Sequence, residues 1–328
     1  MKIAYRLVSA SALLLMLSGC TTTVQVQARF PANDPDAAPL RKVAVADFDG
    51  PEGDHFAYEL EELLANANFD GQRYFTLVDS GHRGVGADST IAARFGRSVG
   101  ADGVYFGRMQ AANFENSRWE ERSSECTKKD ENGKCIKKET FVTPCLRRTF
   151  YMEVYPALVN VRSGVVVYNA RKTASAETSW CRGQSQPISD DQMVEGAVNR
   201  IIADIRPDIA PYNTVLRATV IEIKDGLSES DGTAFDTAVK AAGKGDLMTA
   251  CRTWEAVSKA NPAHAWTIYN LGVCAEANGD FAGALRQYQR ANSMSSKPNS
   301  DVAESIGRVN TLIAAQEELR RTLKKKHK

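Results

Sequence analysis

Residues 42–48, Lys-Val-Ala-Val-Ala-Asp-Phe, form the first strongly ordered segment of this 328-residue chain. The run is apolar on both of its alternating faces, which is typical of a strand buried on both sides of a sheet. Residues 55–69 then place apolar side chains at helical spacing, and 74–79 reads as a second short strand. A helix over 87–99 and a third strand over 103–108 follow. This order predicts an α/β (α+β) sheet domain with covering helices.

The second half of the same domain is richer in strands. The sequence predicts strands over 150–161 and 165–170, the second continuing over 173–180, and then a helix over 190–209. A last strand over 215–223 is expected at the edge of the sheet. The whole α/β domain is therefore placed at 41–225.

Three of these motifs carry a family resemblance. Val-Ala-Val-Ala-Asp-Phe (43–48), Phe-Thr-Leu-Val-Asp (75–79) and Val-Gly-Ala-Asp-Gly-Val-Tyr-Phe-Gly-Arg (99–108) resemble the start of the CsgG-type lipoproteins of curli secretion. The TolB N-terminal domain and the penicillin-binding-protein activator lipoproteins share that start, and residues 158–168 resemble a later hairpin of the same families. The resemblance implies a small periplasmic domain that binds other envelope proteins and carries no catalytic residue.

The first 20 residues have the layout of a secretory leader. Lys2 and Arg6 precede an apolar run over 7–17, which is too short to span a membrane as a helix. The ending Leu17-Ser18-Gly19-Cys20 resembles a bacterial lipobox, so residues 1–19 are interpreted as a lipoprotein signal peptide and Cys20 as the lipidation site, with palmitate among its acyl chains. The alternative is an ordinary leader with an accidental cysteine. No aspartate follows Cys20, which favours the periplasmic face of the outer membrane.

Residues 20–40 are expected to form a lipidated tether. Thr21 to Gln27 is polar, and Pro31, Pro35 and Pro39 then disfavour regular structure. Such a segment would let a globular domain stand away from the membrane surface.

Composition narrows the classes of partner. Without the leader the chain carries nearly equal numbers of basic and acidic residues, so no nucleic-acid partner is expected. The membrane is expected to be contacted through the lipid anchor. The basic run over 320–328 is interpreted as a solvated helix end, with contact to anionic lipid as the alternative.

Six cysteines remain once Cys20 is lipidated, and an oxidising compartment lets them pair. Spacing favours one pair across an Asn-Gly turn, one across a strand-rich segment and one within a helical region. A metal site is the competing interpretation, but no C-x-x-C or H-x-x-x-H spacing occurs. For the last pair, two buried thiols stay open as an alternative. The favoured pairs are Cys126 with Cys135, Cys145 with Cys181, and Cys251 with Cys274.

The C-terminal third repeats itself at a spacing of 34 residues. Gly245-Asp246-Leu247 matches Gly279-Asp280-Phe281, and three further matches support this register. They are Ala250 with Ala284, Trp254 with Tyr288, and Ala238 with Gly272. This is the tetratricopeptide pattern, so residues 231–328 are predicted to be an all-α tetratricopeptide-repeat domain with a capping helix over 300–323.

The first helices of such repeats line a concave groove, which predicts a site for an envelope protein or peptide. Trp266 and Tyr269 would anchor the partner, and Asn270 would bond its backbone. The alternative is that both aromatic residues pack against the α/β domain or the preceding linker. The residues placed at this groove are Phe235, Val239, Trp266, Tyr269, Asn270, Val273 and Glu276.

No catalytic constellation stands out, so the chain is not expected to be an enzyme or to hold a metal or cofactor. Residues 81–86 are rich in glycine but lack the Gly-Lys-Ser/Thr ending of a phosphate loop. Aspartates at predicted strand ends offer a weaker alternative, a hydrolytic or metal site. They are Asp47, Asp49, Asp79 and Asp102.

Together these features predict an outer-membrane lipoprotein that acts as a protein–protein adaptor in envelope assembly or secretion. The alternative is a ring-forming accessory component of a CsgG-like secretion channel, with a homo-oligomer as its signature. Residues 113–143 are highly charged and offer no strand of alternating apolarity to face lipid, which disfavours a pore made by this chain.

Overall fold

The computed structural model describes residues 21–79, 85–295 and 297–325, so the leader and Cys20 lie outside the described residues. The chain divides into two compact units. We call residues 29–213, with the chain from 315 onward, the sheet unit, and residues up to 28 with 214–314 the helical unit. Within the described ranges, no helix combines the length and apolarity needed to cross a membrane.

The sheet unit is built on a mixed six-stranded sheet. Its order is β5-β2-β6-β7-β8, and β9 also pairs with β7. β2 runs parallel to β5 and β6, whereas the pairs made by β7 are antiparallel. The bounds are β2 Lys42–Asp49, β5 Thr76–Leu77, β6 Gly103–Lys129, β7 Cys135–Asn160, β8 Val166–Asn169 and β9 Lys172–Cys181. The predicted mixed α/β class is confirmed.

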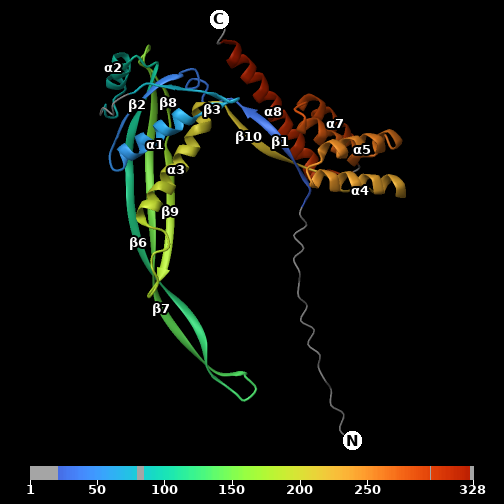
Figure 1. Ribbon diagram of the computed structural model, residues 1–328, viewed down its shortest axis with the longest axis horizontal. Coiled ribbons are helices and arrows are strands. Elements are labelled where there is room, and N and C mark those ends of the chain that lie inside the picture. The colour runs from blue at the N-terminus through green and yellow to red at the C-terminus, as the bar shows by residue number, and fades with distance from the viewer. Residues whose placement is uncertain (1–20, 80–84, 296, 326–328) are drawn as a thin grey trace. The chain divides into compact units, whose positions relative to one another are not determined.

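Helices cover both faces of this sheet. The core under α1 (Gly53–Asn66) and α3 (Asp190–Ile209) lies on one face, and a second core under α2 (Ser89–Val99) lies on the other (Figure 1). Local sequence sets the helix starts: Asp88 caps α2, and Ser189 with Gln192 forms a capping box on α3. A small hairpin of β3 (Asn68–Phe69) and β4 (Gln72–Arg73) follows α1.

Strands β6 and β7 continue far past the helices as a two-stranded ribbon (Figure 1). They stay paired from Gly103 with Asn160 to Lys129 with Cys135. The sequence predicts strands over 103–108 and 150–161 and a turn at the Asn-Gly pair between Cys126 and Cys135, but no strand beside that turn. Residues 113–143 instead form strand over most of their length. The prediction missed them because most of their side chains are exposed, so no apolar period of two marks the strands. We call residues 119–145, which begin where β7 makes its last pair with β9, the arm.

Three disulfides fit a protein of an oxidising compartment such as the periplasm. They join the three pairs that the spacing favours: Cys126 with Cys135, Cys145 with Cys181, and Cys251 with Cys274. The first closes the tip of the arm, and the second joins β7 to β9. The third joins α5 to α6, so these cysteines are not free thiols.

The helical unit repeats one structural pattern twice. Its helices are α4 Glu229–Gly243, α5 Leu247–Ala260, α6 Ala265–Ala277, α7 Phe281–Met294 and α8 Ser300–Lys325, of which α8 continues beyond the unit. Asp246 caps α5 and Asp280 caps α7, each directly after a glycine with a positive φ angle. Trp254 and Tyr288 are both fully buried, as are Ala250 and Ala284. The 34-residue repeat of the sequence is therefore also found in the structure, where equivalent residues cap helices and are buried.

Residues 20–40 are not a tether, which corrects the expectation. Thr23–Phe30 forms β1, which pairs with β10 (Tyr212–Thr219) in a separate two-stranded sheet. Val24, Val26 and Ala28 are buried in strict alternation with exposed residues. The prolines that follow do not free the chain either, because Ala37 and Leu40 pack in the core of the sheet unit.

The last strand also differs from its prediction. Residues 215–223 were expected at the edge of the α/β sheet, but β10 pairs with β1 and ends at Thr219. Its partner lies about 190 residues earlier in the chain, and local patterning cannot reveal such a pairing.

Gly272 tests the repeat packing. A Cβ atom at this position would lie 2.6 Å from the ring of Tyr288, whereas one at Gly307, in α8, would meet nothing within 4 Å. Gly272→Ala should destabilise the protein by about 1–3 kcal/mol through overpacking. Gly307→Ala should be neutral, or stabilising by up to about 1 kcal/mol, because alanine is the better helix former. Thermal melts of both variants check this, and equal shifts would contradict the assigned packing.

Candidate functional site

The α6 face predicted to bind a peptide holds a segment of the chain itself. The Asn270 side chain bonds both backbone groups of Ile221: Oδ1 accepts from the N–H at 3.0 Å, and Nδ2 donates to the carbonyl at 2.9 Å. The adjacent residue, Tyr269, contacts the same segment. Its hydroxyl donates to the Thr219 carbonyl at 3.1 Å and lies 2.8 Å from Ser305 Oγ. Asn270 thus bonds an extended backbone, as the groove hypothesis expects, but the backbone is its own.

Six of the seven predicted groove residues are buried. Only Trp266 keeps part of its side chain exposed. The buried residues are Phe235, Val239, Tyr269, Asn270, Val273 and Glu276. A partner that uses this face must therefore contact Trp266, since the chain's own segment over 219–221 occupies the neighbourhood of Asn270.

Glu276 forms a buried ion pair instead of contacting a partner. Its Oε1 lies 2.6 Å from Arg308 Nε, and its Oε2 accepts from the Tyr288 hydroxyl at 2.6 Å. Burial lowers the pKa of Arg308, but hydrogen bonds and charge from Glu276 outweigh it and raise the pKa overall. Through these bonds Glu276 links α6 to α7 and α8.

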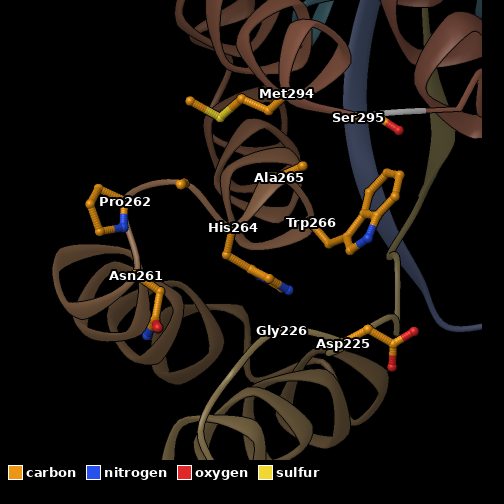
Figure 2. A pocket seen from close by; sticks show the side chains of 10 residues that line it. Asp225, Gly226, Asn261, Pro262, His264, Ala265, Trp266, Met294 and Ser295 are labelled. Carbon is orange, nitrogen blue, oxygen red and sulfur yellow. The ribbon is translucent and has the colours of Figure 1, made fainter.

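A pocket of about 370 Å³ opens beside Trp266, at the start of α6. Among its lining side chains, the His264 imidazole points toward Gly226 and Asp225, whereas the Trp266 indole extends toward Ser295 (Figure 2). Pro262 and Met294 line its other side. The sequence analysis had singled out only Trp266 of this set. A signal for His264 was available, because it immediately precedes a helix and stands three residues before Thr267.

His264 is the N-cap of α6. Its Nδ1 accepts from the Thr267 N–H at 3.2 Å and also lies 2.7 Å from the Thr267 hydroxyl. Burial lowers the pKa of His264, although the Asp225 backbone and carboxylate partly oppose this, and the ring stays neutral near pH 7.

The other predicted sites lack a chemical constellation. Residues 81–84 lie outside the described part of the chain, so the glycine-rich segment is not tested. Among the described residues, the one cluster with metal-ligand geometry is Glu121 with Cys145 and Cys181, and both sulfurs belong to a disulfide. The four strand-end aspartates do not form such a cluster within that same part of the chain.

A polar cluster that the sequence analysis missed lies on β7. The buried carboxylate of Glu153 accepts from Arg171 Nε at 2.6 Å and from the hydroxyls of Tyr155 and Tyr151 at 2.5 and 3.0 Å. The bond from Arg171, followed by that from Tyr155, lowers the pKa of Glu153 to about 2. The alternation of Tyr151, Glu153 and Tyr155 was a usable signal. All these groups are mutually satisfied, so the cluster is structural.

Comparisons with known proteins give weak likenesses. No family model and no curated protein matches the chain. Among solved structures, the PelC dodecamer from Paraburkholderia phytofirmans is 20% identical with a TM-score of 0.26, over 57% of this chain and 99% of that one. The LpoB C-terminal domain from Salmonella enterica is 15% identical with a TM-score of 0.22, over 44% of this chain and 95% of that one. Similarity at this level defines neither a family nor a function.

Substitution of Asn270 tests whether its side chain holds residues 219–221 against α6. Asn270→Ala leaves the N–H and carbonyl of Ile221 without their partner, at about 1–3 kcal/mol for each buried group left unpaired. Asn278, the exposed C-cap of the same helix, is the matched control, and Asn278→Ala should change stability by less than about 0.5 kcal/mol. Urea unfolding measures both. Amide exchange at Val220 and Ile221 should accelerate in the first variant alone; unchanged exchange would contradict the contact.

Glu153 predicts a pH dependence of stability. Its pKa falls from 4.5 to about 2 on folding, so the unfolded chain takes up a proton first as the pH drops. The stabilisation is complete above pH 4.5 and is lost as the pH falls toward about 2. Glu153→Gln should lower the urea midpoint at pH 6, with the gap to the wild type closing near pH 2. Glu177→Gln, in an exposed pair with Arg147, should show only a small gap throughout. A Glu153→Gln gap independent of pH would refute the assignment.

Proposed function

We propose that this chain is a lipoprotein anchored by Cys20 to the periplasmic face of the outer membrane, where it acts as a protein–protein adaptor. The leader and its Leu-Ser-Gly-Cys ending support the anchor. The three disulfides support an oxidising compartment. The anchor would fix the protein to one surface, leaving its folded units to contact envelope partners.

The observation that carries the adaptor role is the arm. Large apolar side chains stand exposed along it, although it is rich in charged residues. They are Trp119, Ile136, Phe141 and Val142. Disulfides close its tip and join its base to β9, so the arm is preorganised and loses little conformational freedom when a partner binds. Exposed aromatic residues on a stiff, polar support are typical of binding surfaces.

We also propose that the helical unit is of the tetratricopeptide class. The paired glycine–aspartate caps and the equivalent burial of Trp254 and Tyr288 support this assignment. In this interpretation the unit contacts a partner at its Trp266 end, because its inner face already holds residues 219–221.

Assembly with further copies is a second candidate role, which one observation favours. β2 pairs with β6 only as far as Arg108, so among the described strands none covers this edge of β6 along the arm. An uncovered edge is a template for strand addition. The native mass of the acylated protein in mild detergent separates the two roles, because a ring of fixed stoichiometry would favour assembly and a monomer would exclude it.

Site-specific crosslinking in cells tests the adaptor role. A photoreactive residue at Trp119, 41% exposed on the arm, should give discrete adducts with a different protein. The matched control is Tyr58, 59% exposed on α1, where the same probe should give none. Adducts are resolved by mass and identified by sequencing.

The anchor is tested in the same cells. Cys20→Ser should abolish palmitate incorporation, release the protein from membranes and reduce the Trp119 adducts, because the arm is no longer held near its partners. Adducts that contain only this chain would contradict the adaptor role and support self-assembly. The absence of adducts at Trp119 would reject the arm as the binding surface.

A further inference from the structure

A hollow of about 360 Å³ lies at the base of the arm. It is found where β9 ends and β6 and β7 continue as a two-stranded ribbon (Figure 1). Three of its side chains come from one row across the sheet, because Leu146 on β7 pairs with Arg118 on β6 and with Trp180 on β9. Residues paired across antiparallel strands share a face, so all three point to the same side of the sheet. We call this site, which Pro144 and Arg182 also line, the basal hollow.

The basal hollow opens on the face opposite to Trp119. Trp119 directly follows Arg118 in β6, and successive side chains of a strand point to opposite faces. The pairing register is unbroken between residues 111 and 126, so the alternation holds along most of the arm. On this basis the Trp119 face also carries three carboxylates, Glu121, Glu125 and Glu139. The two faces of the arm therefore differ in charge.

The guanidinium groups at the basal hollow lack acidic partners. On the same face, Arg148 is paired with Asp190, whose carboxylate lies 2.5 Å from its Nη2. Arg118 and Arg182 form no such ion pair with any residue that the structure describes, and no aspartate or glutamate lines the hollow. Like charges at one small site repel each other, so an anionic group bound there would be stabilised by both.

The positive charge continues outward from the hollow along the same face. Arg122 lies four residues beyond Arg118 in β6, and Lys138 pairs with Cys126 farther along the arm. Both cations are exposed. Glu120 interrupts the row between the two arginines, so an evenly charged polyanion or lipid surface would be repelled there. A peptide avoids this repulsion, because its carboxylates can be spaced to meet the cations alone.

The basal hollow also offers an apolar contact. Leu146 and Trp180 line it and are half-buried. Its volume suits one ring-sized group, and an aromatic ring would pack on the indole and contact the guanidinium groups. The disulfide between Cys145 and Cys181 holds β7 to β9 at this point, so the hollow is preorganised.

We propose that this face of the arm binds an acidic segment of another protein, with one aromatic side chain in the basal hollow. Carboxylates of the segment would lie on Arg118, Arg122 and Arg182. The inference goes beyond the proposed adaptor surface, because the site is on the other face from Trp119 and does not depend on it. An adaptor holds two partners at once, and faces of opposite charge select different ones.

Fluorescence anisotropy of a labelled peptide, Asp-Glu-Asp-Phe-Asp-Glu-Asp, tests the proposal when the mature protein is titrated into it in mild detergent. We expect saturable binding that weakens as salt is added, because the charges are exposed. Replacing the phenylalanine by glycine should weaken binding at least about tenfold, since the aromatic burial is lost. The peptide with lysine at every acidic position should not bind, because the arginines repel it.

Three variants locate the site. Arg118→Ala and Arg182→Ala should each weaken binding about threefold to fivefold, and the double variant at least about tenfold. Arg147→Ala is the matched control, because it removes a cation from the opposite face of β7 and should change the affinity by less than about twofold. Circular dichroism checks that each variant is folded.

Equal affinity for the phenylalanine and glycine peptides, absence of saturation, or an equal loss in Arg147→Ala would overturn the proposal. If phosphatidylglycerol vesicles displace the peptide from the wild type but not from the double variant, the face binds lipid and the protein segment is the wrong occupant. If the protein self-associates and the double variant does not, the occupant is another copy of this chain. Crosslinks from Trp119 should persist in the double variant, and their loss there would contradict two separate surfaces.

Discussion

The paired hydrogen bonds between Asn270 and Ile221 are the interaction on which the helical unit depends. They hold an extended segment against α6 as a neighbouring strand would, and Tyr269 repeats the contact at Thr219. That segment directly continues β10, which in turn pairs with β1. One buried amide therefore couples the helices to a two-stranded sheet whose strands, β1 and β10, lie far apart in the chain. An amide is suited to this role because it satisfies a donor and an acceptor together without burying charge.

The elements that the sequence predicted are those set by interactions between residues close together in the chain. Helix α3 was placed at 190–209 by its apolar spacing, and the capping box that the structure shows at its start is an equally local signal. The repeat at Gly245 and Gly279 was found for the same reason, since each glycine and the following aspartate define a helix start. Strand β1 was missed although Val24, Val26 and Ala28 alternate, because its partner lies in β10 and nothing nearby indicates the pairing.

At the candidate site, too, local features could be predicted from the sequence and long-range contacts could not. The register of the repeat grouped Tyr269 and Asn270 on one face of α6, and both side chains bond the chain's own extended segment at 219–221. No pattern could show that the chain itself supplies that backbone, because the segment at 219–221 is brought to α6 by tertiary folding. His264 was missed because an N-cap histidine is uncommon, and its contact with Thr267 becomes apparent only in the structure.

The arm raises a different physical question, how a ribbon with little core of its own remains ordered. Its backbone pairs satisfy their own hydrogen bonds, but an isolated hairpin is only marginally stable in water. The disulfide between Cys126 and Cys135 removes conformational freedom from the unfolded tip, where few packing contacts exist. Cys145 with Cys181 adds a third strand at the base. Covalent links thus replace the missing core, which leaves the arm's apolar side chains free to face a partner.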